Sequence, residues 1–91
     1  MKSIQIVKFG GPEVLVIKDV DIAKPGPKEV LIKNKSIGLN FIDVYHRTGL
    51  YPIPLPSGIG LEASGVIEEI GSEVKLFKVG DRVTHASMPI G

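Results

Sequence analysis

The stretch that most constrains the fold is residues 38–71, because glycines, prolines and a helix cap divide it into short segments of fixed type. A strand is expected to end at Gly38. Asn40, a favoured N-cap, then opens a short helix that Gly49 closes. Three prolines exclude a central strand between residues 50 and 60 and indicate a semi-rigid loop. The stretch therefore predicts a helix and a loop held between two strands.

Short apolar runs separated by turn signals predict strands over most of the remaining chain. The predicted strands cover residues 3–9, 14–20, 29–37, 60–70 and a run that starts at 79. A glycine–proline turn joins the first two strands, which indicates a hairpin, and Gly65 indicates a bulge or the close approach of another backbone. About five or six short strands and one helix at 41–48 predict a mostly β fold, a partly open antiparallel barrel.

Length and composition limit the classes of protein that this chain can belong to. Its 91 residues fit one domain, residues 1–91, and its 11 basic and 10 acidic residues form no stripe that favours nucleic acid. The absence of cysteine excludes a disulfide framework and fits a cytoplasmic protein. The start has no signal-peptide pattern, and no apolar stretch approaches the ~20 residues of a membrane helix. We therefore expect no nucleic-acid and no membrane partner.

Residue types alone offer little support for metal or nucleophilic chemistry. His46, Glu62 and His85 are the plausible metal ligands, and their spacing matches no recognised ligand pattern, so no metal is expected. Ser57 and Ser64 lack the context of an activated nucleophile. No glycine-rich loop precedes a long helix, so no site for a dinucleotide pyrophosphate is expected either.

What remains is a polar and aromatic wall around the predicted helix. Its members are Asn40, Phe41, Ile42, Tyr45 and Tyr51. An asparagine amide both donates and accepts hydrogen bonds, and a tyrosine offers a flat apolar ring with a hydroxyl group. Such groups suit a planar ring that carries carbonyl or amide groups. The alternative is that the asparagine only caps the helix and the tyrosines only pack, and residue types alone favour this alternative.

Five motifs occur in order along the chain. They are FGGPEVL at 9–15, GLNFIDVY at 38–45, RTG at 47–49, PSGIGLEASGVI at 56–67 and GDRV at 80–83. In this order the motifs resemble the N-terminal part of quinone oxidoreductases, the zeta-crystallin-like branch of the medium-chain dehydrogenase/reductase superfamily. The resemblance covers essentially the whole chain. It implies a GroES-like barrel that forms the substrate side of an enzyme transferring a hydride from NADPH to a quinone.

The resemblance also implies roles for individual residues. Zinc-dependent relatives carry a cysteine at the position of Asn40 and a histidine at that of Leu61, so the chain resembles the zinc-free branch. The matching segment of that branch lines the nicotinamide side of the cleft. The implied cofactor-binding residues are Asn40, Phe41, Ile42, Asp43, Val44 and Tyr45, and the implied catalytic residues are Asn40, Tyr45 and Tyr51.

Members of this family are far longer than 91 residues, and the Rossmann domain is missing after Gly91. The chain is therefore expected to be truncated, to bind NADPH weakly or not at all, and to be inactive alone. A separate Rossmann-domain chain and self-association are the expected partnerships. The alternative is a stand-alone GroES-like module that binds a partner or itself without enzymatic activity. A co-chaperonin-like role would rest on fold analogy alone.

Overall fold

The structure is a computed structural model that describes residues 1–87 and 90–91. The chain divides into two compact units, which are described separately below. The first contains Met1–Asp21, Gly38–Leu61 and Ser87–Gly91, and the second contains Ile22–Ile37 and Glu62–Ala86. The described residues form two three-stranded sheets and one α-helix, so the expectation of a mostly β fold with one short helix is confirmed. That residues 1–91 form one domain stays a prediction.

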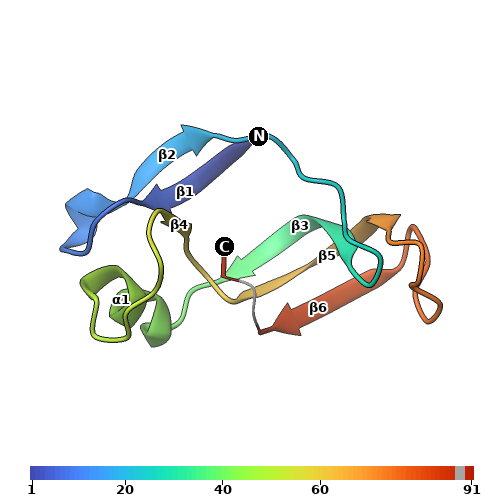
Figure 1. Cartoon of the computed structure of the whole chain (residues 1–91). Coiled ribbons are helices and arrows are strands. Elements are labelled where there is room, and N and C mark those ends of the chain that lie inside the picture. Colours follow the sequence, from blue (N-terminus) through green and yellow to red (C-terminus); the bar gives the residue numbers. More distant parts are fainter. Residues whose placement is uncertain (88–89) are drawn as a thin grey trace. The chain divides into compact units, whose positions relative to one another are not determined.

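The sheet of the first unit has the strand order β2-β1-β4 (Figure 1). Its strands are β1 (Lys2–Ile6), β2 (Val16–Asp19) and β4 (Ser57–Gly58). β1 pairs antiparallel with β2, which confirms the predicted hairpin, and pairs antiparallel with β4 along its other side. The buried side chains of Ile6 and Val14 belong to this unit.

The first strand is shorter than the sequence indicates, since it ends at Ile6 and not at residue 9. The N–H of Gly10 donates to the carbonyl of Arg47, at 3.0 Å, so the chain has turned away from the sheet by then. A 3₁₀ helix, Pro12–Val14, follows, and proline suits such a turn because its φ angle is already fixed. The second strand consequently starts at Val16, two residues later than predicted.

The predicted loop between residues 50 and 60 contains β4, which the sequence does not indicate. β4 has only two residues and lies at the edge of its sheet, where prolines nearby do not interrupt a central hydrogen-bond ladder. The peptide bond between Leu55 and Pro56 is cis. The exclusion of a central strand from this segment is therefore confirmed, whereas a plain loop throughout is wrong.

The helix α1 (Phe41–Thr48) has the bounds that its caps predict. Asn40 is in an extended conformation, and its backbone N–H donates to the Oδ2 atom of Asp43 at 3.0 Å in a capping box. Gly49 adopts a left-handed φ of 86° and its N–H donates to the carbonyl of Tyr45 at 3.1 Å. Both ends of α1 are thus fixed by residues next to it in the sequence.

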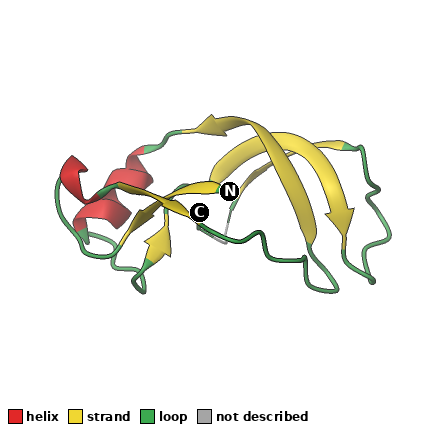
Figure 2. Ribbon diagram, turned by 90° about the horizontal axis from the view of Figure 1, so that it is seen from above, coloured by secondary structure: helices red, strands yellow, loops and turns green. Residues whose placement is uncertain are grey.

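The sheet of the second unit has the strand order β3-β5-β6. Its strands are β3 (Val30–Gly38), β5 (Glu62–Ile70) and β6 (Arg82–Ala86). β5 and β6 are antiparallel, and the arrows of β3 and β5 in Figure 1 also run in opposite directions. Figure 2 shows that the long strands of this sheet bend along their length. The buried side chains of Ala63 and Ile67 form its small core.

Two details of this sheet differ from the sequence-based expectation. β6 begins at Arg82 and not at residue 79, because Gly80, with a φ of 95°, turns the chain just before the strand. β3 does not alternate between buried and exposed residues. Its first three residues are half-buried and the following positions up to Ile37 are exposed, so position along β3 decides burial.

Candidate cofactor and substrate site

The residues that the sequence proposes for a site gather around α1 in the first unit. Asn40 precedes the helix, Tyr45 lies in its middle and Tyr51 follows it. The two tyrosine rings pack edge to face, with centroids 5.3 Å apart and an interplanar angle of 78°. The N–H of Tyr51 also donates to the carbonyl of Tyr45, at 3.3 Å. The turn at Gly49 therefore places two hydroxyl-bearing rings side by side.

Apolar side chains around α1 are exposed, and we call this surface the outer face. It consists of Leu39, Phe41, Val44 and Leu50. Leu39 is 86% exposed and Phe41 is 80% exposed, which is far more than large apolar residues in a core show. Tyr45, four positions after Phe41 on the same helix, is only half-buried. Two apolar residues of the helix, Phe41 and Val44, are thus exposed, whereas Ile42 is half-buried.

The buried face of α1 is polar. Asp43 is 5% exposed and His46 is 6% exposed. Asp43 holds the start of the helix through its Oδ2 atom, so its expected contact with a cofactor stays a prediction. In the sequence, His46 stands out only as a plausible metal ligand, and its burial is not predicted. The spacing of the two residues links their burial. His46 lies three positions after Asp43, so both side chains lie on the same side of the helix.

The described residues contain no group of three or more His, Cys, Asp or Glu side chains that could hold a metal ion. His46 is buried in α1, whereas Glu62 and His85 are exposed on the neighbouring strands β5 and β6 of the other unit. The three residues proposed as metal ligands thus come from both units. Metal-free function stays a prediction.

Purified without chelators, the chain is expected to contain far less than one zinc ion per molecule. A structural zinc site needs four ligands, usually cysteine and histidine. The family resemblance implies that Asn40 and Leu61 stand where zinc-dependent relatives carry two of their ligands. Inductively coupled plasma mass spectrometry on the purified chain measures this directly, with zinc added and dialysed away as a control. About one zinc per chain that survives dialysis would contradict the prediction.

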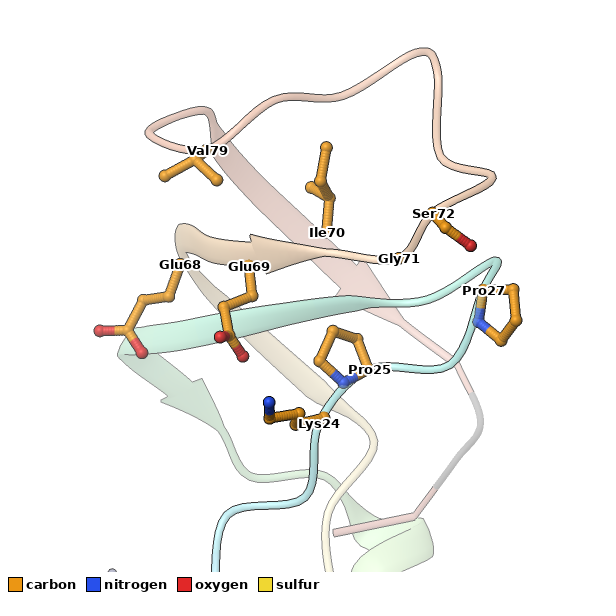
Figure 3. A pocket seen from close by; sticks show the side chains of 9 residues that line it. All are labelled: Lys24, Pro25, Pro27, Glu68, Glu69, Ile70, Gly71, Ser72 and Val79. Carbon is orange, nitrogen blue, oxygen red and sulfur yellow. The ribbon is translucent and has the colours of Figure 1, made fainter.

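Two hollows of the second unit contain no residue that the sequence proposes for catalysis or cofactor binding. The larger, of about 520 Å³, is open, and Lys24 from a loop faces Glu68 and Glu69 of β5 across it (Figure 3). The smaller, of about 360 Å³, has a lining that includes the apolar residues Val30, Ile32 and Ile67.

In the described part of the chain no helix is long and apolar enough to cross a membrane.

Comparison with known proteins identifies the class of fold. Residues 26–90 match the family described as the alcohol dehydrogenase GroES-like domain. The quinone oxidoreductase of Pseudomonas aeruginosa is 58% identical over 91 residues, a match that covers 99% of this chain and 28% of that protein. The crystal structure of the Pseudomonas syringae pv. tomato quinone oxidoreductase has a TM-score of 0.96 and 56% identity. It covers 99% of this chain and 28% of the other.

The chain belongs to the family of alcohol dehydrogenase GroES-like domains. Within the medium-chain dehydrogenase/reductase superfamily it is similar to quinone oxidoreductases, which confirms the family resemblance expected from its motifs. The structure of Escherichia coli quinone oxidoreductase complexed with NADPH is also similar, with a TM-score of 0.97, 48% identity and coverage of 99% of this chain and 28% of that one. The chain therefore spans somewhat more than a quarter of the length of the relatives that it matches.

Proposed function

We propose that the chain is the substrate-side part of a zinc-independent, cytoplasmic NADPH:quinone oxidoreductase. The observation that carries this proposal is the similarity to quinone oxidoreductases over 99% of the chain. Asn40 and Leu61 at the positions of zinc ligands support the zinc-independent branch. The similar E. coli enzyme, whose structure contains NADPH, supports this cofactor for a complete enzyme.

The residues around α1 fit the planar ends of the two reactants. The edge-to-face pair of Tyr45 and Tyr51 offers ring surfaces and two hydroxyl groups at one place. Asn40 stands at the start of the same helix. In the proposed site the tyrosine hydroxyls donate hydrogen bonds to a quinone carbonyl, and Asn40 contacts the nicotinamide amide. NADPH supplies the hydride when it is bound, and these side chains orient the quinone and stabilise the charge that develops on its oxygen.

The residues of the proposed site fit only the nicotinamide end of the cofactor. The one α-helix of the described part begins at Asn40–Phe41 with a capping box, so the N–H groups of Asn40 and Asp43 already have acceptors from the helix's own sequence. No glycine-rich loop precedes this helix. A few hydrogen bonds of about 1 kcal/mol each do not offset the ~4 kcal/mol or more that immobilising a ligand costs. The phosphates must therefore be bound by another chain or another part of a longer chain.

The test uses a hybrid enzyme, in which this chain replaces the matching segment of the P. aeruginosa quinone oxidoreductase. Oxidation of NADPH by a simple quinone is expected to proceed in the hybrid enzyme within about tenfold of the parent rate. The chain alone is expected to show no turnover and to bind NADPH at millimolar concentration or more weakly. A stable hybrid enzyme without activity would contradict the proposed function. Turnover by the chain alone, scaling with its concentration, would contradict the proposed location of the cofactor site.

A second candidate function, a stand-alone binding module without enzymatic activity, is favoured by the exposed outer face. Leu39 and Phe41 each expose more than three-quarters of their surface, and exposed apolar patches on soluble proteins usually mark contact sites. A separate Rossmann-domain chain or a second copy of this chain could cover them. An active hybrid enzyme would favour the enzymatic proposal over this module.

We expect the isolated chain to self-associate, and Phe41→Ser to shift it toward monomer. Phe41 is 80% exposed, so its replacement removes apolar surface from the outer face at little cost to the fold. Leu76→Ser, at a loop position that is 92% exposed in the second unit, serves as the matched control and should leave association unchanged. Light scattering over a concentration series measures the mass. A monodisperse monomer at high concentration would show that this surface does not pair.

A further inference from the structure

Two polar atoms on the buried face of α1 have no hydrogen-bond partner within the described part of the chain. They are Oδ1 of Asp43 and Nδ1 of His46. The other carboxyl oxygen of Asp43, Oδ2, accepts the N–H of Asn40 at 3.0 Å. A buried polar atom without a partner costs free energy, and two such atoms three residues apart on one helix are unusual in a stable fold. The pair therefore needs a physical explanation.

The spacing of the two residues suggests what lies between them. Side chains three positions apart on a helix have Cβ atoms about 5 to 6 Å apart and face the same side. No direct hydrogen bond joins the two atoms. A water molecule is small enough for such a gap. It can donate to Asp43 while it either accepts from or donates to His46, so the bridge suits both tautomers of the imidazole.

We propose that a single buried water bridges Asp43 Oδ1 and His46 Nδ1, and that the bridged pair acts as a positioning device for α1. Oδ2 of Asp43 holds the backbone of Asn40, and the bridge ties the same carboxyl group to His46, one turn further along. The start and the middle of the helix are thereby fixed from inside. Asn40, before the helix, and Tyr45, which lies between Asp43 and His46 in the sequence, keep their orientation as a result.

The functional part of this inference rests on the proposed function, in which Asn40 and Tyr45 contact cofactor and quinone. Asp43 and His46 are buried and do not touch either reactant in this scheme. They act through the helix and are positioning residues, not catalytic ones. The bridge itself stands without the proposed function, since it follows from burial and from the two unpartnered atoms.

The first test is structural and uses the complete 91-residue chain. A crystal structure at a resolution that shows ordered waters should contain one water within about 3 Å of both atoms. A double-mutant cycle then measures coupling. Asp43→Ala and His46→Ala should show an interaction of about fivefold or more in the unfolding equilibrium constant. The control cycle pairs Asp43→Ala with Thr48→Ala, at an exposed helix position, and should be additive within about twofold.

The second test separates positioning from mere stability in the hybrid enzyme. His46→Asn places a polar atom near the position of Nδ1, whereas His46→Gln places one near Nε2. At a temperature at which both variants are fully folded, His46→Gln should lower kcat by about tenfold with KM little changed, while His46→Asn should restore most of kcat. A purely stabilising residue would change the melting temperature and leave kcat of the folded enzyme alone.

The outcomes distinguish the two levels of the inference. Absence of the water in a well-ordered structure, or an additive cycle between Asp43 and His46, would overturn the bridge. Equal kcat in the asparagine and glutamine variants would overturn the positioning role. A hybrid enzyme that is folded and inactive before any substitution would instead contradict the proposed function, and the structural test would still decide whether the bridge exists.

Discussion

Gly71→Ala and Gly65→Ala are each expected to lower the free energy of unfolding by about 3 kcal/mol or more. A Cβ atom on Gly71 would overlap the carbonyl oxygen of Gly26 and lie 2.6 Å from the carbonyl carbon of Pro27. A Cβ atom on Gly65 would overlap the carbonyl oxygen of Lys33. In both cases the obstacle is backbone, which cannot rotate away as a side chain can. The alanine variants must therefore push strands or loops of the second unit apart.

At Gly71 the displacement would also break hydrogen bonds. The N–H of Gly71 donates to the carbonyl of Glu29 at 2.8 Å, and the N–H of Glu73 donates to that of Pro27 at 2.7 Å. Both bonds close the loop between residues 26 and 29 onto the end of β5. Moving this loop by the width of a methyl group would lengthen them beyond the usual range for hydrogen bonds. Loss of these bonds adds to the cost of the steric overlap.

Gly80→Ala is the matched control for these glycine variants. Gly80 has a φ of 95°, but a Cβ atom there would meet nothing within 4 Å. Its cost is therefore backbone strain alone, about 1 to 2 kcal/mol. Urea denaturation followed by circular dichroism compares the variants. An unchanged dependence of the free energy of unfolding on urea concentration shows that the same transition is measured in each. If Gly65→Ala and Gly80→Ala had the same urea midpoint of unfolding, the backbone of β5 at Gly65 could not lie as close to the carbonyl of Lys33 in β3 as the structure shows.

The parts of the fold that the sequence predicts correctly are those controlled by neighbouring residues. Asn40 and Gly49 determine the two ends of α1, because a cap acts within one turn of the helix. Gly65 inside a strand indicates a close backbone approach for a similarly local reason, since only glycine has no Cβ atom there. The hairpin of β1 and β2 follows from two apolar runs close together in the sequence, although the connection between them is longer than a tight turn and contains a 3₁₀ helix.

The parts that the sequence does not predict depend on residues far away in the chain. β4 forms because its backbone pairs with the free edge of β1. A segment of two residues is too short to show a strand pattern in the sequence. The rotation of α1 is a second case. The helical period places Asp43 and Phe41 on different sides of α1. The usual rule would put the side with Asp43 in solvent and the side with Phe41 in the core. The structure shows the reverse, with Asp43 buried and Phe41 exposed. Which side faces inward is decided by the surroundings of the helix.

The same distinction applies to the candidate site. Tyr45 and Tyr51 lie on either side of Gly49 in the sequence. In the structure their rings are in contact, because the chain turns at Gly49. Their catalytic role depends on groups that this chain does not contain, so it stays a prediction. The burial of His46 is not predictable from its residue type, because histidine is neither mainly buried nor mainly exposed in proteins.

In the hybrid enzyme, Tyr45→Ala is expected to lower kcat/KM for the quinone by about 100-fold. The substitution removes a hydroxyl group proposed to donate to the quinone carbonyl, and also the ring that packs on Tyr51 at 5.3 Å. Without its neighbour the Tyr51 ring, already 53% exposed, has no fixed orientation. Stopped-flow measurement of NADPH oxidation at several quinone concentrations gives kcat and KM separately.

Two companion variants separate the causes of that loss. Tyr45→Phe keeps the edge-to-face contact and removes only the hydroxyl group, so we expect a loss of about tenfold that appears in kcat more than in KM. Lys33→Ala, at an exposed position of β3 in the second unit, is the control and should stay within about twofold of the unsubstituted hybrid enzyme. If Tyr45→Phe were fully active while Tyr45→Ala was not, the ring and not the hydroxyl group would be what the site needs. If Tyr45→Ala behaved like Lys33→Ala, Tyr45 would have no part in the reaction, and the tyrosine pair would only hold the loop after α1 in place.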